Sequence, residues 1–495
     1  MINIEVKNEI ENTIKNNSRS KNVILSLSKY VKDNCISGFY KFNMTSSFCF
    51  AIILFVTATS SIFSQEVPQL ETYSLKNGLK IYLLQYGKIP AVNVRFIINT
   101  GKKNETPGQQ GYSEITATML LKGNTKYTEE IQNNMAFKLG GELNSSSTFD
   151  YTSINANFLA KDFDTGIDLF SSAILHPLFD KDKLDQNISY LVDYNNPAKM
   201  DIADLTDVFS DLNIYGTTSP LGRHYYKTQL QLITPDKLKE FHQFNFTPKN
   251  SSVIVCGNFN ATEIKIGLEK YFGTWQSTFS EVNGVALDVP SIKRKEIAFI
   301  NRMGATQCAL QWNKIAPSIK DKDYLAFRVA NTILSRTLFA EIREKGGKTY
   351  GISSNYQPTQ FSNLFVIQCS VRSDEMANTI TLFDKTLQDF NLATVSQEDF
   401  DKAVITLRMG IISSEMPESI LSFYNPVVYD FQKRKNFLTD LATLKIEDVQ
   451  KTIKKYFTAD SYRLVVAGDE SVVNTQLSTL KGLVKYKPAD IEKDN

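Results

Sequence analysis

Histidine is scarce in this chain, and its scarcity limits the chemistry that the sequence can support. The 495 residues include three histidines, His176, His224 and His242. A zinc site in a protein often takes two histidines from adjacent turns of one helix. No two of these histidines have that spacing: His176 precedes a proline, His224 follows Gly-Arg, and His242 is expected to face outward from a helix. The sequence therefore predicts loop or surface histidines and no zinc site built from them.

The sequence also contains no motif for a catalytic nucleophile or for nucleotide binding. The sequence contains no Gly-x-Ser-x-Gly element, and the glycines at 101–111 lack the spacing of a phosphate-binding loop. Cys256, Cys308 and Cys369 lie in apolar stretches, and no Cys-x-x-Cys pair occurs. We interpret these cysteines as small core residues.

Composition narrows the class of protein further. Hydrophobic residues make up 42% of the chain and aromatic residues 11%, which excludes global disorder. The formal net charge is +2, and residues 65–495 carry 48 basic and 49 acidic side chains. Because the chain also lacks a basic tract, it has no electrostatic footprint for nucleic acid.

An apolar stretch near the N-terminus has the pattern of a secretory signal. Residues 48–56 are nine apolar residues without a break, far fewer than the roughly 20 that span a bilayer as a helix. Small and polar residues follow, so cleavage after Ser64 is the simplest expectation. Residues 1–43 fit a mis-assigned start, with Met44 directly before the signal, although a start there leaves no Lys or Arg ahead of the apolar run. We expect 1–64 to be a leader, the protein to be exported (periplasmic or secreted), and no stable membrane span to remain.

Two distant segments, 233–258 and 444–469, match without a gap. Identical residues occur at four pairs of positions: Phe246/Phe457, Thr247/Thr458, Val255/Val466 and Gly257/Gly468. Each segment has the pattern of an acid-capped helix, a short turn and an apolar strand that ends at glycine. This match favours an internal duplication. It predicts homologous domains at 66–276 and 296–485, joined by a linker at 277–295.

The two halves also share a coarse order of elements. Alternating patterns predict paired strands at 73–84 with 91–99, 143–149 with 151–158, 296–301 with 306–313, and 350–357 with 362–372. Helical patterns occur near 111–122, 128–139, 162–175, 180–193, 200–213, 321–345, 374–390 and 397–414. Hairpins mixed with helices predict an α+β fold with mainly antiparallel sheets.

A spaced set of residues in the first half carries a family resemblance. The set consists of Asn77-Gly78, Pro90, Gly101, Glu105, Gly111 and the run Met119-Leu120-Leu121-Lys122-Gly123-Asn124. In this order the residues resemble the opening domain of the pitrilysin/insulinase-type zinc metallopeptidases, which include the mitochondrial processing peptidases. Residues 338–354 look like the second-domain signature of that family. The resemblance spans roughly 70–480 and implies two homologous domains that face each other like a clam shell.

The family's zinc motif is degenerate in this chain. The family holds zinc with a helical His-x-x-Glu-His and a downstream Glu. In the register set by Gly111 and Met119, those positions hold Glu114, Ala117 and Thr118, and no Glu occurs between 143 and 239. The resemblance therefore implies that this chain binds no metal itself, and that zinc is expected in a partner.

A second part of the family's active site is retained. In the family an Arg and a Tyr of the second domain, seven residues apart, approach the zinc. The Tyr donates a hydrogen bond to the oxyanion of the tetrahedral intermediate, and the Arg binds a carbonyl of the substrate. Arg343 and Tyr350 match this pair in type and spacing. Without the resemblance, a helix C-terminal Arg and a strand-initial Tyr would be ordinary structural residues.

Two functions of different classes follow from the resemblance. The first is a subunit of an exported, heteromeric zinc metallopeptidase that binds unfolded peptides and completes the active site of a zinc-bearing relative. This subunit would be inactive alone. The second is a non-catalytic structural or peptide-binding scaffold of the same fold, in which Arg343 and Tyr350 are relics. Neither reading involves nucleic acid.

Overall fold

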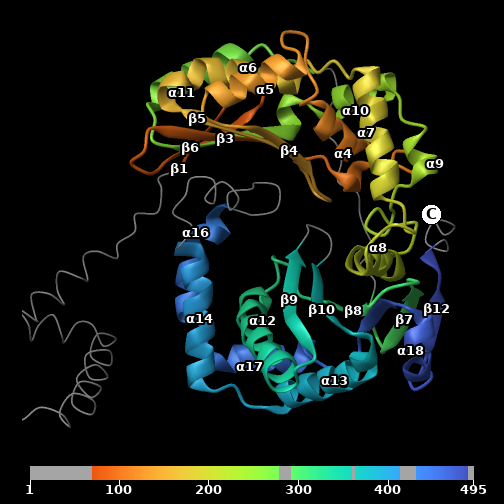
Figure 1. The fold of residues 1–495 in the computed structure, drawn as a ribbon. Coiled ribbons are helices and arrows are strands. Elements are labelled where there is room, and N and C mark those ends of the chain that lie inside the picture. The colour runs from red at the N-terminus through yellow and green to blue at the C-terminus, as the bar shows by residue number, and fades with distance from the viewer. Residues whose placement is uncertain (1–69, 278–290, 359–362, 413–430, 489–495) are drawn as a thin grey trace, which may run out of the picture. The chain divides into compact units, whose positions relative to one another are not determined.

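The computed structural model describes residues 70–277, 291–358, 363–412 and 431–488. These residues form two six-stranded sheets, each covered by helices (Figure 1). The predicted leader at 1–64 lies outside the described residues, as does most of the predicted linker. No described helix is both long enough and apolar enough to cross a membrane.

The first sheet has the strand order β1-β2-β6-β3-β5-β4. Its strands are β1 (Leu70–Ser74), β2 (Lys80–Gln85), β3 (Ala91–Ile98), β4 (Leu143–Ser147), β5 (Thr152–Leu159) and β6 (Ser251–Gly257). The β2–β6 pair is parallel, whereas the other four pairs are antiparallel. The predicted pairing of 143–149 with 151–158 is confirmed by β4 and β5.

The predicted hairpin between 73–84 and 91–99 is wrong. Strand β6 lies between β2 and β3, and β1 and β2, which overlap the stretch 73–84, form a hairpin with each other. All seven residues of β6 are buried, so this strand is stable only with neighbours on both sides and helices or strands over both faces. Its burial places it in the centre of the sheet, although it comes last in the sequence.

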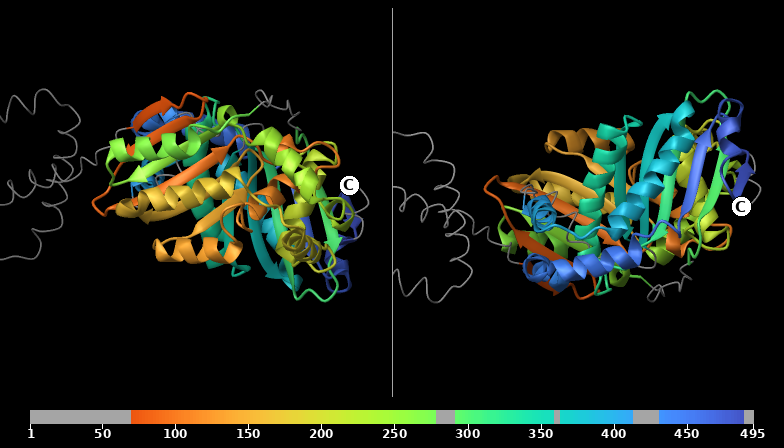
Figure 2. Two further views of the ribbon diagram at one scale, coloured as in Figure 1. Left: turned by 90° about the horizontal axis from the view of Figure 1, so that it is seen from above. Right: turned by 90° about the horizontal axis from the view of Figure 1, so that it is seen from below.

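The helices of the first half are α4 (Tyr112–Met119), α5 (Glu129–Lys138), α6 (Phe163–Leu175), α7 (Lys181–Tyr194), α8 (Ile202–Tyr215), α9 (Lys227–Leu230), α10 (Pro235–Asn245) and α11 (Ala261–Phe272). Of these, α6 and α11 pack on one face of the first sheet. Figure 2 (left) shows α6 and α11 crossing above the strands. Their apolar residues, such as Phe170 and Leu268, join Val94 and Phe96 of β3 in one core.

The second sheet repeats the arrangement in the order β12-β7-β11-β8-β10-β9. Its strands are β7 (Glu296–Asn301), β8 (Gln307–Ile315), β9 (Thr349–Pro358), β10 (Asn363–Arg372), β11 (Arg463–Gly468) and β12 (Leu483–Tyr486). Strand β7 is parallel to both β11 and β12, so both sheets are mixed. The predicted pairing of 296–301 with 306–313 is wrong for the same reason as in the first sheet, because the buried β11 separates β7 from β8. The predicted β9–β10 pairing is confirmed.

The helices of the second half are α12 (Tyr324–Leu338), α13 (Met376–Leu392), α14 (Gln397–Ile412), α16 (Phe431–Thr443), α17 (Ile446–Tyr456) and α18 (Glu470–Leu477). The single helix predicted over 321–345 is in fact two kinds of helix. Regular α-helix ends at Leu338, and residues Phe339–Lys345 form a π-helix. π-Helical turns are rare in proteins, and those that do occur are frequently found at functional sites.

The internal repeat is visible in the structure. Helix α10 leads into β6 as α17 leads into β11. Phe246 and Phe457 directly follow the two helices as their C-cap residues, and both are buried in the core of their own sheet. Gly257 and Gly468 end the two strands. The matched residues therefore occupy equivalent positions in the two halves.

Helix α8 departs from a simple division into halves. It comes from the first half of the sequence, yet Leu205 and Phe209 pack against Ile300 and Val465 of the second sheet. Polar contacts accompany this packing: Gln368 donates to Asp207 at 2.6 Å, and Asn313 donates to Ser210 at 3.1 Å. The predicted domain bounds, which assign α8 to 66–276, remain a prediction.

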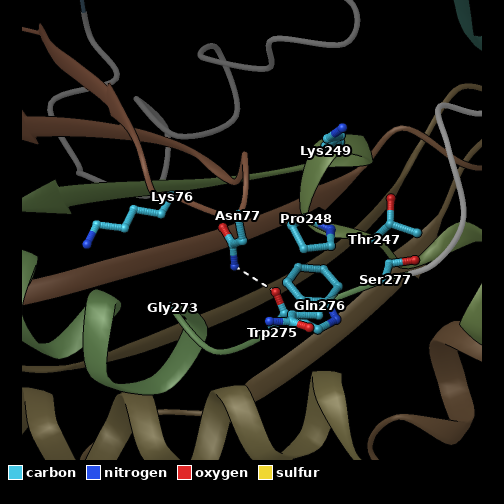
Figure 3. A pocket seen from close by; sticks show the side chains of 9 residues that line it. All are labelled: Lys76, Asn77, Thr247, Pro248, Lys249, Gly273, Trp275, Gln276 and Ser277. Carbon is cyan, nitrogen blue, oxygen red and sulfur yellow. Dashed lines mark hydrogen bonds between the residues drawn. The ribbon is translucent and has the colours of Figure 1, made fainter.

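The Asn77-Gly78 turn, part of the family resemblance, connects the first sheet to the C-terminal end of α11 by hydrogen bonds. The Asn77 amide donates hydrogen bonds to the carbonyls of Phe272 and Trp275, at 2.7 and 2.9 Å. Figure 3 shows Asn77 pointing toward Trp275 beside a small surface hollow. Gly78 has φ +94°, a conformation that glycine adopts without strain. The sequence signal at this turn is therefore explained by structure.

We predict that Asn77→Ala lowers the free energy of unfolding by about 1–3 kcal/mol, since two carbonyls lose their donor. The control is Lys76→Ala, which removes an exposed neighbour and should stay within about 0.5 kcal/mol of the parent. Urea titration followed by circular dichroism measures both. An equal effect of the two substitutions would contradict the assigned role of Asn77.

Candidate functional site

Helix α4 carries the three positions that the resemblance assigns to the zinc motif. Its left-handed N-cap, Gly111, has φ +89° and turns the chain into the helix. Ala117 is buried against the core side, whereas Glu114 and Thr118 are half-buried on one face. The Thr118 hydroxyl donates to the Glu114 carbonyl at 3.1 Å, a bond within the helix itself. Glu114 is thus the single strong ligand among these three positions.

The Glu114 carboxylate already has a partner. The Tyr225 hydroxyl donates a hydrogen bond to it from the loop that precedes α9. The pKa of Tyr225 lies well above its usual value, because burial and the negative charge of Glu114 both disfavour the phenolate, and Tyr194 at the end of α7 adds to this effect. The phenol therefore stays protonated and remains a donor to Glu114.

A zinc ion does not fit this set of donors. Zinc sites need three or four nitrogen, sulfur or carboxylate ligands that converge on one point. At α4 a single carboxylate is bound to a phenol, and its neighbours are an alanine and a threonine. Within the described parts of the chain, no three His, Cys, Asp or Glu side chains lie together in a way that could hold a metal.

A buried carboxylate lies at the start of the same helix. Glu105 accepts hydrogen bonds from the Gly111 amide at 3.1 Å and from the Ser113 amide and hydroxyl at 2.8 and 2.6 Å. Burial raises the pKa of Glu105 to about 7, although these bonds favour the charged form. Arg223 donates to the Glu105 carbonyl at 3.3 Å. Glu105 thus positions the N-terminus of α4.

The histidines occupy three separate environments. His176 is exposed where α6 ends, as predicted for a loop residue. His224 lies in the predicted loop, and burial holds its pKa well below the usual value. The prediction that His242 faces outward is wrong. Its ring packs against Phe179 and Phe246, its Nε2 lies 2.8 Å from the Ile174 carbonyl, and burial lowers its pKa to about 4.

The three cysteines of the described chain are buried and free, which agrees with their interpretation as core residues. Burial raises the pKa of Cys256 and Cys369 to about 12 and that of Cys308 to about 11. A thiol with such a pKa is neutral at pH 7 and therefore a poor nucleophile.

Arg343 and Tyr350 lie on either side of one tight turn. Arg343 is exposed near the end of the π-helix, with its guanidinium over the Phe339 ring, 4.6 Å from the ring centroid. The chain turns at Gly347, whose φ is +61°, and the Lys348 amide donates to the Ile342 carbonyl at 3.1 Å. Tyr350 follows as the second residue of edge strand β9 and is 90% exposed. Both polar groups are thus open to a ligand.

The structure joins some of the predicted site residues and separates others. It connects Glu114 with Thr118 on α4 and brings Arg343 and Tyr350 to one turn. Within the described residues, no hydrogen bond or ion pair joins these two groups. Sequence reasoning missed Tyr225, the partner of Glu114. Its position next to His224 in a loop rich in polar aromatic residues was the available signal.

The comparisons with known proteins agree on one family. The profile "Insulinase (Peptidase family M16)" matches residues 82–203, and "Peptidase M16 inactive domain" matches residues 232–407. Together the two ranges cover more than half of the chain.

Individual relatives extend this match over about four fifths of the chain. The "Uncharacterized zinc protease YmxG" of Bacillus subtilis is 22% identical over 79% of this chain and 96% of its own. The "Zinc protease PqqE" of Helicobacter pylori is 21% identical over 82% of this chain and 94% of its own. The crystal structure of a peptidase M16 inactive domain from Pseudomonas fluorescens has the same fold, with a TM-score of 0.74 and 20% identity over 81% of this chain and 98% of that one. The two sheets of this chain have the fold of that crystal structure. The two matched profiles show that this chain belongs to the insulinase/pitrilysin (M16) peptidase family.

Proposed function

We propose that this chain is the non-zinc subunit of a heteromeric M16 peptidase. It would bind unfolded peptide and supply Arg343 and Tyr350 to an active site whose zinc is held by a related partner. One observation supports the proposal: the Tyr225 hydroxyl donates a hydrogen bond to Glu114, the one carboxylate among the three α4 positions, while Arg343 and Tyr350 are exposed. Relatives named zinc proteases align with this chain over nearly their whole length.

The chemistry of the two exposed residues suits that role. A phenol hydroxyl can donate a hydrogen bond to the oxyanion that forms when a peptide carbonyl is attacked. A guanidinium can bind a carbonyl of the substrate before and during reaction. Their surroundings support precise placement, since β9 is fixed along its length to β10 and Arg343 stacks on Phe339. We further propose an extracytoplasmic location, on the pattern of residues 48–64.

The first prediction concerns metal content. The purified chain should retain well below one zinc per chain after dialysis, because its α4 positions offer one carboxylate that is already hydrogen-bonded. Elemental mass spectrometry measures this, with the Helicobacter pylori zinc protease prepared in parallel as the positive control. One tightly held zinc per chain would refute the proposal.

The second prediction concerns activity. The chain alone should cleave no unstructured peptide, and chelator-sensitive cleavage should appear when a zinc-bearing family member from the same source is added. Co-purification identifies that partner, and a quenched fluorescent peptide reports the rate. Chelator-sensitive cleavage by the isolated chain would show that the active site is not shared.

The third prediction tests the exposed pair in the reconstituted enzyme. Tyr350→Phe should lower kcat about a hundredfold, near 3 kcal/mol, with a small change in KM, because its hydrogen bond forms mainly in the transition state. Arg343→Ala should raise KM as well, because a carbonyl contact exists in both states.

The matched control is Lys345→Ala, which removes another exposed cation from the same π-helix. It should leave both kinetic constants near those of the parent. All three variants should melt near the parent temperature, since each altered side chain is exposed. If Tyr350→Phe keeps kcat within about twofold of the parent, the scaffold function replaces the shared active site.

A further inference from the structure

Strand β9 contains an irregularity at Tyr350, the residue to which we assign the oxyanion contact. Along most of its length, β9 pairs with β10 one residue for one. Near its start the register shifts, so that two residues of β9, Tyr350 and Gly351, lie opposite one residue of β10, Ser370. The pairs on either side of the shift are Ile352 with Cys369 and Thr349 with Val371. This two-against-one arrangement is a β-bulge, a feature that is common next to active sites, where it redirects a side chain.

The bulge decides which way the Tyr350 side chain points. Successive residues of a regular strand point to opposite faces of the sheet, so regular pairing would place Tyr350 on the same face as Ile352. Ile352 packs into the core of the second sheet. The extra residue of the bulge shifts this alternation by one position, and the Tyr350 side chain is 90% exposed. The access of a ligand to its hydroxyl therefore depends on the bulge.

The Thr349 hydroxyl is bonded to this irregular backbone. Its oxygen lies 2.7 Å from the Ser370 carbonyl across the bulge and 2.8 Å from the Gly351 carbonyl within it, and its proton can be donated to either. The same oxygen accepts a hydrogen bond from the Gly351 amide at 3.2 Å. An extra residue disrupts the ladder of backbone hydrogen bonds, and backbone groups that lose a ladder partner need another one. The Thr349 hydroxyl thus replaces part of the ladder at the bulge.

The residue before Thr349 is fixed as well. The Lys348 ammonium forms a half-buried ion pair with Glu375 at 2.7 Å. The Lys348 amide also donates to the Ile342 carbonyl of the π-helix at 3.1 Å. Lys348 and the pairing with β10 therefore hold the chain on the two sides of the bulge, and the Thr349 hydroxyl holds the bulge itself.

An ordinary structural explanation accounts for only part of this arrangement. Bulges in edge strands discourage pairing with other chains, and β9 is an edge strand. That purpose requires no particular side chain at position 350. Regular pairing would instead place the Tyr350 ring on the core face, where burial of its apolar surface stabilises the fold. A hydrogen-bond donor in a catalytic site, in contrast, must be exposed to the substrate and held in a fixed direction by its neighbours.

We propose that Thr349 is a positioning residue for Tyr350. Its hydroxyl fixes the β-bulge and thereby the direction of the phenol. Thr349 does not contact the substrate and acts through Tyr350 alone. The catalytic consequence rests on the proposed function, whereas the direction of Tyr350 can be measured without any activity.

Steady-state kinetics of the reconstituted enzyme test this role with Thr349→Val, which keeps the shape of the side chain and removes its hydroxyl. The kcat should fall about tenfold or more with KM near that of the parent, because the phenol is needed mainly in the transition state. Thr349→Ser keeps the hydroxyl and should stay within about threefold of the parent kcat. The matched control is Thr479→Val, which removes an exposed hydroxyl that donates to the Gln476 carbonyl after α18, and it should leave both constants unchanged.

A double variant separates positioning from a general weakening of the fold. If Thr349 acts through Tyr350, adding Thr349→Val to Tyr350→Phe should lower kcat by less than about twofold further. An equal fall of about tenfold with and without Tyr350→Phe would overturn the proposal. It is also overturned if Thr349→Val alone keeps kcat within about twofold of the parent while Tyr350→Phe lowers it. If Thr349→Val fails to fold, Thr349→Ala removes the same hydroxyl and takes its place in each measurement.

Fluorine nuclear magnetic resonance of the full chain, labelled with 3-fluorotyrosine, reports on the direction of the phenol without a partner or a substrate. The Tyr350 resonance is identified by its absence from Tyr350→Phe. Thr349→Val should shift or broaden this resonance, whereas Thr349→Ser and Thr479→Val should leave it in place. An unchanged resonance in Thr349→Val would overturn the positioning role. A shifted resonance together with an unaltered kcat in Tyr350→Phe would support that role and refute the shared active site.

Discussion

The central strands of the second sheet are apolar on both faces, and the arrangement of the chain depends on covering both. On β11, Leu464 and Val466 enter the large core beneath α12 and α13, whereas Val465 and Ala467 point the other way. Helix α8 covers that second face, although it belongs to the first half of the sequence. Each buried side chain of this kind contributes about 1.5–3 kcal/mol. The two homologous halves are therefore joined by a shared core as well as by the linker.

Buried polar groups on helix α4 must likewise find partners within the chain. Helix α4 carries one half-buried carboxylate, that of Glu114, and an unpaired buried charge is costly. Tyr225 resolves this cost by donating a hydrogen bond to Glu114. Glu105 keeps the helix start in place through three hydrogen bonds. The local structure of α4 thus depends on hydrogen bonds within the chain.

The first sheet has a polar outer face. On β3, Asn93 and Arg95 alternate with Val92, Val94 and Phe96, which pack into the core. The neighbouring Asn157 carboxamide accepts a hydrogen bond from the Glu142 amide at 3.1 Å, so part of this polar face stabilises the chain itself. In the second half, the π-helix before Gly346 is a local departure from regular structure, and it carries Arg343, to which we assign function.

The sequence by itself determined the class of fold, the duplication, most helices and the residues at the degenerate site, because these depend on local periodicity, caps and spacing. It also indicated the family. It could not determine that β6 and β11 separate the strands predicted to pair, since strand order depends on which buried strands need neighbours on both sides. Likewise, the packing of α8, the burial of His242 and the contact of Tyr225 with Glu114 join residues far apart in the chain. Only the tertiary structure decides such contacts, because burial and hydrogen-bond pairing are satisfied by the whole fold and not by neighbours in sequence.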